Sequence, residues 1–204
     1  MPDAPRSFAR ICVFCGSSGG TDPAYRAAAV ATGRALAERG IVTVYGGGSA
    51  GLMGALAAAA LAAGGRVIGV LPVGLFPDGV TATPLRDDHT GTLEVIETAD
   101  MHTRKARFHA LADAYVVLPG GLGTLEEAAE VATWAQIGLH DSPIGFLDVN
   151  GYFGSLLAWL DRAVDDGFLR ESNRDALVRA ADIDTLLSRL GSHRASDDSK
   201  WIDQ

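Results

Sequence analysis

The sequence predicts an α/β protein in which helices cover both faces of one parallel sheet. Short apolar runs alternate with helical segments along the 204-residue chain, and this alternation is typical of parallel strands joined by crossover helices. The 25 glycines gather where apolar runs end, as expected for loops in which the backbone closely approaches another group. Together these observations predict a doubly wound, Rossmann-like sheet with its glycine loops at one edge.

Seven apolar runs predict the strands. They span residues 10–15, 41–45, 66–71, 93–97, 115–118, 144–147 and, as a short edge strand, 177–178. Gly16, Gly46, Pro72 and Pro119 directly follow four of the runs, and both residue types commonly end strands. Because right-handed crossovers place the carboxyl ends of parallel strands on one edge, we expect the following loops to gather there.

Six segments between the strands predict helices. They span residues 23–39, 51–63, 100–112, 124–138, 153–166 and 182–190. Asp22 and Pro23 are residue types preferred at a helix cap and first position. Residues 73–91 are polar and irregular, and predict a long loop of the kind that is often functional. The helix at 124–138 carries an apolar stripe that is expected to cover the sheet: Leu125, Ala128, Ala129, Ala132 and Ala135.

The chain length favours a single domain over residues 1–191, followed by a polar tail, residues 192–204, that is expected to be disordered. We find no secretory signal and no apolar run of membrane-spanning length, so a cytoplasmic protein is expected. Cys12 and Cys15 lie in the first strand, where they would point to opposite faces as reduced core residues rather than as a redox pair. The formal charge of −8 disfavours nucleic acid as a partner.

The loop Gly46-Gly47-Gly48-Ser49-Ala50-Gly51 fits the pattern Gly-x-Gly-x-x-Gly between a strand and a helix. Backbone amides at such a helix start can bind phosphate, so Gly47 and Gly48 are candidate substrate-binding residues. A dinucleotide site would also need an acidic residue at the end of the next strand, but that strand ends Val70-Leu71-Pro72. A Walker loop would need Gly-Lys-Ser/Thr, which does not follow. Tight helix–strand packing is an alternative role for these glycines.

A second loop, Pro119-Gly120-Gly121-Leu122-Gly123-Thr124, also joins a strand to a helix. Its backbone amides and threonine hydroxyl are suited to a phosphate monoester. The candidate ligands are Gly120, Gly121, Gly123 and Thr124. Glu126 and Glu127 follow within the expected first turn, where carboxylates can also simply stabilise a helix N-terminus. Adjacent helical residues point about 100° apart, so one carboxylate can face a pocket while the other faces solvent.

Two further groups of polar residues are expected at the same edge of the sheet. Met101-His102-Thr103-Arg104-Lys105 starts a helix. A charged cluster of this kind is usually a solvated face, but it can also serve one phosphate or carboxylate. Ser17 and Ser18 follow the first strand without a nucleophile elbow around them, and are expected to donate hydrogen bonds to a ligand.

Taken together, these motifs resemble one family. They are, in order, Phe14-Cys15-Gly16-Ser17-Ser18, Gly46 to Gly54, Val67 to Pro72, Met101-His102-Thr103-Arg104-Lys105, Pro119 to Glu127 and Thr133-Trp134-Ala135-Gln136. Over residues 10–190 the chain is similar to the LOG ("lonely guy") family, the cytokinin riboside 5′-monophosphate phosphoribohydrolases. The string Pro-Gly-Gly-x-Gly-Thr-x-x-Glu joined to Met-His-x-Arg-Lys is the specific part of this resemblance.

The resemblance implies a homodimer or larger assembly that hydrolyses N6-modified adenosine monophosphate, and often AMP, to free base and ribose 5-phosphate. Arg104 and Glu127 match the family's catalytic pair. Met101 and Lys105 are implied as substrate-binding residues beside the glycine loops, and neither a cofactor nor a metal is implied. Phe108 stands where family members often have Met, which puts in question the shape of the base pocket or the dimer contact.

Breaking a ribosyl N-glycosidic bond develops positive charge on the sugar and negative charge on the leaving base. We therefore expect Glu127 to bind the ribose and activate a water molecule. Arg104 is expected to position the substrate and assist departure of the base.

Two alternatives come from other classes of protein. A non-catalytic nucleotide-binding or carrier protein would also use glycine loops, but it would not need Arg104 and Glu127 together. Members of the family are often labelled lysine decarboxylases, yet a pyridoxal phosphate enzyme needs a lysine for its Schiff base. The chain has two lysines, Lys105 and Lys200. Its five histidines lack metal-ligand spacing, so metal catalysis is not expected.

Overall fold

The computed structural model describes residues 5–74 and 90–193. Seven strands form one sheet in which every adjacent pair is parallel. They are β1 (Arg10–Phe14), β2 (Val42–Tyr45), β3 (Arg66–Pro72), β4 (Thr92–Thr98), β5 (Ala114–Val117), β6 (Ile144–Leu147) and β7 (Leu177–Ala180), in the order β4-β3-β2-β1-β5-β6-β7. The predicted α/β fold with a doubly wound, Rossmann-like sheet is therefore confirmed.

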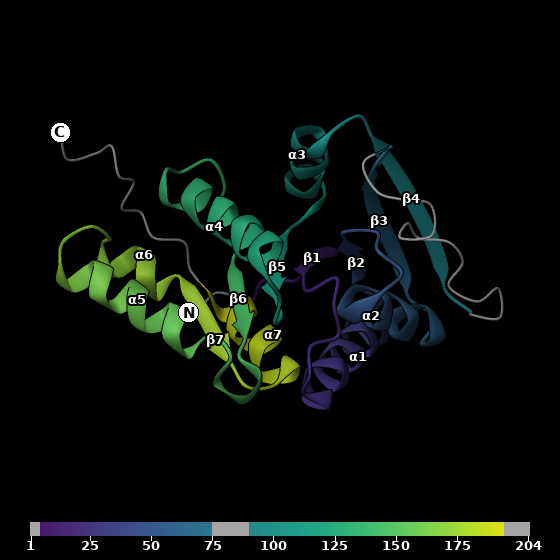
Figure 1. Ribbon diagram of the computed structural model, residues 1–204, viewed down its shortest axis with the longest axis horizontal. Coiled ribbons are helices and arrows are strands. Elements are labelled where there is room, and N and C mark those ends of the chain that lie inside the picture. Colours follow the sequence, from purple (N-terminus) through teal and green to yellow (C-terminus); the bar gives the residue numbers. More distant parts are fainter. Residues whose placement is uncertain (1–4, 75–89, 194–204) are drawn as a thin grey trace.

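Helices cover both faces of the sheet. On one face lie α1 (Pro23–Glu38), α2 (Gly51–Ala62) and α7 (Ile183–Ser192), and on the other lie α3 (Met101–Leu111), α4 (Leu122–Gln136) and α5 (Gly154–Asp165) (Figure 1). The 3-10 turn η1 (Val149–Gly151) and the short helix α6 (Glu171–Asp175) were not predicted, because a helical pattern is read over a window longer than either element. Within the described ranges, no helix is long and apolar enough to cross a membrane.

Two apolar cores lie on opposite faces of the sheet, and β1 contributes to both. Ile11, Val13 and Cys15 belong to the core beneath α1, α2 and α7, whereas Cys12 and Phe14 belong to the other core. Both cysteines are buried and free. Their placement on opposite faces is the one predicted from the alternation of side chains along a strand.

Helix α4 begins two residues before its predicted start at Thr124. Gly121 is the N-cap and Leu122 the first helical residue. Glu126 and Glu127 consequently lie in the second turn, and their predicted place in the first turn is wrong. Glycine at the cap allows the helix to begin earlier than residue preferences suggested.

The buried face of α4 also differs from the predicted apolar stripe. Ala128 and Val131 are buried against the sheet, whereas Leu125 is 43% exposed and Ala129 is exposed as well. Alanine is found on both faces of this helix, so the apolar pattern did not indicate which face meets the sheet.

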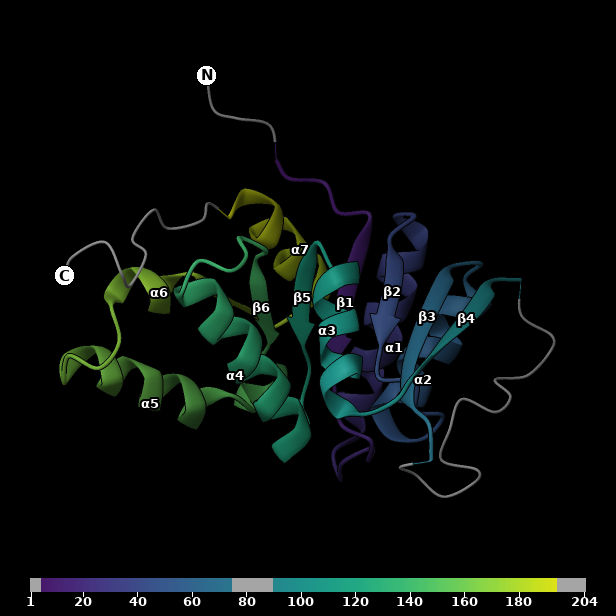
Figure 2. The ribbon, with the colours of Figure 1, turned by 90° about the horizontal axis from the view of Figure 1, so that it is seen from above.

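The chain reverses its winding direction between β1 and β5. From β1 the connections lead outward through β2 to β3, and from β5 they lead the opposite way through β6 to β7. In doubly wound sheets, ligands bind in the crevice outside the carboxyl ends of the strands at this switch point. Helices α3 and α4 lie side by side over β1 and β5, next to this position (Figure 2).

Of the predicted domain, residues 1–4 lie outside the described ranges, whereas its end at residue 191 lies within them. Helix α7 continues to Ser192, two residues past its predicted end. Of the predicted polar tail, residues 194–204 are outside the described residues, as are residues 75–89 of the predicted long loop.

Candidate functional site

A cavity of about 500 Å³ opens at the switch point, a size common for small-molecule sites. Five segments distant in sequence line it: residues 13–17 of β1 and its loop, Gly46, Gly48 and Met53 around the start of α2, Leu71 of β3, Met101 and Arg104 of α3, and residues 121–124 with Glu127 of α4. The prediction that the glycine loops gather at the carboxyl edge of the sheet is confirmed.

The loops after β1 and β5 pack closely together. The Gly16 amide donates to the Pro119 carbonyl at 3.0 Å. A Cβ atom on Gly120 would lie 2.1 Å from Thr124 Oγ1 and 2.9 Å from the Gly16 nitrogen, so this position has no room for a side chain. The Tyr152 hydroxyl donates to the Gly120 carbonyl at 2.5 Å. Gly120 therefore sets how closely the start of α4 approaches β1.

The two glycine loops differ in what their helices offer a ligand. At the start of α2, the Gly16 carbonyl accepts the amides of Leu52 and Met53 at 3.1 and 3.4 Å, so these donors are already used. At the start of α4, no side chain caps the helix, and α-helices leave their first amides without partners inside the helix. An added Cβ on Gly121 or Gly123 would meet open space. Of these two helix starts, that of α4 is therefore the more accessible to a ligand.

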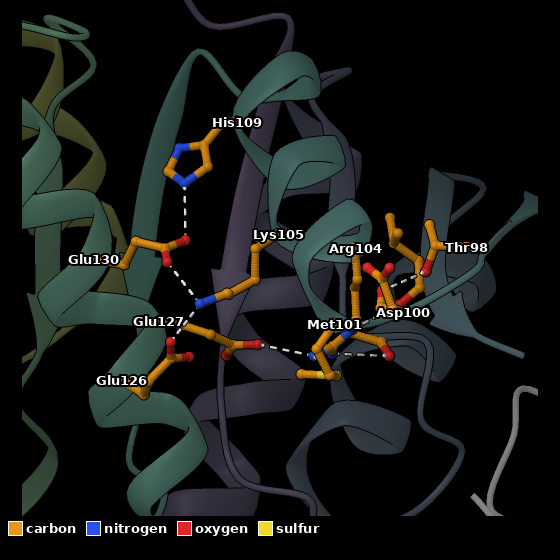
Figure 3. A network of polar contacts seen from close by, with 11 residues as sticks. Thr98, Asp100, Met101, Arg104, Lys105, His109, Glu126, Glu127 and Glu130 are labelled. Carbon is orange, nitrogen blue, oxygen red and sulfur yellow. Dashed lines mark hydrogen bonds and ion pairs between the residues drawn. The ribbon is translucent and has the colours of Figure 1, made fainter. Parts of the chain in front are cut away.

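Arg104 is held in a buried position at the floor of the cavity. Its Nε donates to the Val70 carbonyl at 3.1 Å and its Nη2 to the Gly46 carbonyl at 3.3 Å. Its Nη1 donates to Glu127 Oε1 at 3.2 Å (Figure 3). The guanidinium carbon also lies 4.9 Å from the ring centroid of Phe108, within the range of a cation–π contact. Contacts on several sides leave this cation a single orientation.

Glu127 contacts Arg104 directly at the wall of the cavity, with only 12% of its side chain exposed. Burial raises the pKa of its carboxyl from 4.5 to about 7, and the positive charge of Arg104 offsets only part of that rise. The pKa of a general base is most effective near the working pH. A carboxyl group that can gain and lose a proton near neutrality therefore lies beside a fixed cation.

The predicted site residues divide into two groups. Those that line the cavity are Ser17, Gly48, Met101, Arg104, Gly121, Gly123, Thr124 and Glu127, whereas Ser18, Gly47, Lys105 and Gly120 do not. Gly47 adopts φ +76°, and a Cβ there would strike the Leu71 side chain at 2.5 Å. Lys105 turns away from the cavity, and its amine contacts Glu126 and Glu130.

Several residues that shape the cavity were not predicted. The Gly46 carbonyl accepts a hydrogen bond from Arg104 Nη2, and a Cβ atom on Gly46 would lie 2.4 Å from that nitrogen. Phe108 does not line the cavity but is buried, with Phe14 against its ring at 5.7 Å. Its ring supports the Arg104 guanidinium, and the expected effect of Phe108 on the base pocket or dimer contact stays a prediction. The i, i+4 spacing of the two residues on α3 is the signal that indicates this contact.

Within residues 5–74 and 90–193, no group of three or more His, Cys, Asp or Glu side chains is arranged to hold a metal ion.

Comparisons with known proteins show the family to which the chain is similar. A family model described as "Possible lysine decarboxylase" matches residues 53–190. The cytokinin riboside 5′-monophosphate phosphoribohydrolase LOG7 of Arabidopsis thaliana is 47% identical over 190 residues, which cover 93% of this chain and 84% of that protein. The probable cytokinin riboside 5′-monophosphate phosphoribohydrolase LOGL9 of Oryza sativa subsp. japonica is 49% identical over 183 residues, covering 90% and 78%.

A solved structure of the molybdenum cofactor carrier protein of Chlamydomonas reinhardtii is also similar. It aligns with a TM-score of 0.60 at 23% identity, covering 89% of this chain and 94% of the carrier. At this level of identity the likeness shows a shared fold.

Proposed function

The chain belongs to the LOG family of cytokinin riboside 5′-monophosphate phosphoribohydrolases, and we propose that it hydrolyses N6-modified adenosine 5′-monophosphate to free base and ribose 5-phosphate. The observation that carries the proposal is the buried pair Arg104–Glu127, 3.2 Å apart at the wall of the cavity, beside the uncapped start of α4. A phosphate site, a fixed cation and a carboxylate within one cavity are the groups that this reaction needs.

We assign the substrate phosphate to the start of α4. Backbone amides and the helix dipole favour an anion at a helix N-terminus, and Gly121 and Gly123 leave the approach open. Thr124 is buried at the cavity wall with its hydroxyl close to Gly120. The proposed ligands are Gly121, Gly123 and Thr124, with Ser17, Gly48 and Met101 contacting other parts of the nucleotide.

Glu127 is the proposed ribose ligand and base. Its carboxylate form offsets positive charge on the ribose in the transition state and accepts a proton from the attacking water. A pKa of about 7 provides a substantial fraction of the deprotonated form at neutral pH. The partner Arg104 stabilises that form.

Arg104 is the proposed electrophilic partner. Carbonyl groups of Val70 and Gly46 fix its Nε and Nη2, so the guanidinium needs no rearrangement when the substrate binds. A preorganised cation is most effective where negative charge develops in the transition state. We assign it to positioning the substrate and assisting departure of the base.

The main alternative is a carrier that binds a nucleotide without turnover. A carrier needs the phosphate site but has no use for a carboxylate with a near-neutral pKa beside a buried cation. A lysine decarboxylase is disfavoured by Lys105, whose amine is engaged by Glu126 and Glu130 at 2.5 and 2.6 Å. Lys200 lies outside the described residues.

Product analysis tests the proposed reaction. Purified protein is incubated with AMP and with isopentenyladenosine monophosphate, and free base is followed by chromatography. We expect base release by the wild type and a loss on the order of a hundredfold in kcat for Glu127→Gln, the magnitude typical of one lost transition-state contact.

The control for this test is nucleotide affinity, measured by calorimetry on both proteins. Glu127→Gln should still bind AMP, because the proposed phosphate ligands are unchanged. Binding of AMP by the wild type without any release of base would support the carrier instead.

We also propose that the protein forms a homodimer. A groove of about 520 Å³ runs between α4 and α5, and its lining includes Ala129, Trp159 and Phe168. Trp159 and Phe168 are 64% and 85% exposed. Large apolar side chains gathered in one exposed groove are typical of a protein–protein contact.

We also propose a cytoplasmic location, because the two cysteines are buried and unpaired. Cys12 and Cys15 are buried on opposite faces of the sheet, and unpaired buried cysteines are typical of reducing compartments.

A further inference from the structure

Lys105 forms two short ion pairs outside the cavity. Its Nζ lies 2.5 Å from Glu126 Oε1 and 2.6 Å from Glu130 Oε2 (Figure 3). The lysine side chain is 16% exposed and that of Glu130 is 21% exposed. Glu126 is 52% exposed, so the pair with Glu130 is the more shielded of the two. An ion pair that is shielded from solvent holds a more defined geometry than a pair on an open surface.

These pairs connect the two helices that carry the proposed catalytic groups. Lys105 follows Arg104 on α3, and its two partners lie on either side of Glu127 on α4, one helical turn apart. A single ammonium that contacts both carboxylates resists sliding of α3 along α4. The opposed position of Arg104 and Glu127 depends on that alignment.

A second contact strengthens the same connection. His109 Nε2 lies 3.2 Å from Glu130 Oε1, and its Nδ1 lies 3.0 Å from the Tyr115 hydroxyl on β5. The His109 ring stacks on Trp134 of α4 with centroids 3.9 Å apart. Glu130 is therefore held by two side chains of α3, one of which is itself anchored to the sheet.

Lys105 also balances the charge around Glu127. The groups whose charge acts on the Glu127 carboxyl are Arg104 and Lys105 on α3 and Glu126 on α4, and Cys12 and Cys15 couple to it from β1. Arg104 and Lys105 lower the pKa of Glu127, whereas Glu126 raises it. Without the ammonium, Arg104 would be the one cation left to oppose the negative charge of Glu126 among the groups that act on Glu127.

We infer that Lys105 is a positioning residue that joins α3 to one turn of α4 and so keeps Arg104 and Glu127 in contact at the wall of the cavity. The inference rests on the proposed function, and it differs from a direct role of Lys105 in binding the nucleotide. The lysine acts through the alignment of two helices and through the charge next to Glu127.

The first test compares Lys105→Met with Lys105→Arg. We expect the Met variant to lower kcat for AMP by about tenfold to a hundredfold, since small misplacements of catalytic groups have effects of this size. KM should change less than threefold, and the pH at which kcat falls on the acid side should move upward. Arginine should restore most of the activity, because it can also contact both carboxylates.

The second test removes the connection from the other helix. Glu126→Gln/Glu130→Gln leaves Lys105 in place and should also lower kcat. The pH at which its kcat falls on the acid side should move down, because the charge of Glu126, which raises the pKa of Glu127, is gone. Arg39→Met is the matched control. It breaks a helix–helix ion pair with Asp184 at 2.8 Å, far along the fold from the cavity, and should leave kcat unchanged.

Three outcomes would overturn the inference. A raised KM with unchanged kcat in Lys105→Met would make Lys105 a substrate ligand. A lower melting temperature with unchanged kcat in both variants would leave it a purely structural role. If the pH at which kcat falls on the acid side moved in the same direction in both variants, an effect of the Lys105 charge on Glu127 would be excluded. Absence of base release by the wild type is a separate result, which would contradict the proposed function itself.

Discussion

At the scale of single residues, the carboxyl group of Glu127 is maintained at a cost to the fold. Its side chain is 12% exposed, and burial outweighs the attraction of Arg104 in raising its pKa to about 7. Desolvation disfavours the charged form of a buried acid. Stability that is sacrificed at a catalytic group is a common feature of enzymes.

The raised pKa of Glu127 predicts how stability changes with pH. Between about pH 4.5 and pH 7 the folded protein retains a proton that the unfolded chain has released, so stability falls as the pH rises through this window. Above pH 7 the full cost is on the order of 3 kcal/mol. We therefore expect Glu127→Gln to gain stability relative to the wild type from pH 5 to pH 8.

Urea unfolding at pH 5 and at pH 8 measures the stability that Glu127→Gln gains over the wild type. Glu130→Gln serves as the control of opposite sign, because hydrogen bonds from Lys105 and His109 outweigh burial and lower the pKa of Glu130. Its carboxylate stabilises the fold at neutral pH, and that stabilisation is lost as the pH falls. If the free energies of unfolding of Glu127→Gln and the wild type differed by the same amount from pH 5 to pH 8, the buried environment of Glu127 would be contradicted.

At the scale of elements, the helix starts determine which loop can receive a ligand. Asp22, Asp100 and Asp182 cap α1, α3 and α7 with their side chains, and the Gly16 carbonyl occupies the first amides of α2. Helix α4 has no side-chain cap. These four helices thus have partners at their starts. Helices α5 and α6 also lack a side-chain cap, but among the three uncapped starts it is that of α4 that lines the cavity.

Two glycines of the loop before α4 are expected to respond differently to the same substitution. Gly120→Ala places a methyl group against Thr124 and the Gly16 backbone, and should cost about 1–3 kcal/mol through overpacking. Gly123→Ala adds a methyl group in open space inside the helix, where alanine is favoured by about 0.5–1 kcal/mol. Thermal unfolding of the two variants and the wild type provides the comparison.

The ranking of the two variants is the decisive result. Gly120→Ala should melt below the wild type and Gly123→Ala at or above it. Equal melting temperatures would mean that the loops after β1 and β5 can move apart without loss, contrary to their close packing.

At the scale of the whole molecule, the two faces of the sheet differ in how completely their helices are buried. Helix α2 lies deep in the fold, with Leu52, Leu56 and Leu61 buried, whereas Leu157 is the buried residue of α5. The side of the molecule formed by α4 and α5 therefore presents apolar residues that the described chain leaves uncovered.

The groove between α4 and α5 predicts the assembly in solution. The wild type should have twice the chain mass of 21.2 kDa by light scattering, and Trp159→Glu should shift it toward the monomer. Leu139→Glu is the matched control, because Leu139 is equally exposed at 64% but does not line the groove. A monomeric wild type, or equal dissociation by both variants, would contradict this interface.

The local pattern of the sequence was sufficient to predict the sheet, its winding and the edge at which the glycine loops meet. Alternating apolar runs and helix caps act over a few residues, and right-handed crossovers then determine the edge. The motif resemblance led to Arg104 and Glu127 as a pair, and their side chains do meet at 3.2 Å.

Tertiary structure decided which way the neighbouring groups face and how they are charged. Lys105 and Arg104 are adjacent in sequence, yet one contacts Glu126 and Glu130 while the other faces the cavity. The Gly16 carbonyl decides that α2 has fewer free amides than α4, and burial raises the pKa of Glu127. Each outcome depends on atoms brought together from distant segments, and packing between segments is information that residue spacing along one chain does not carry.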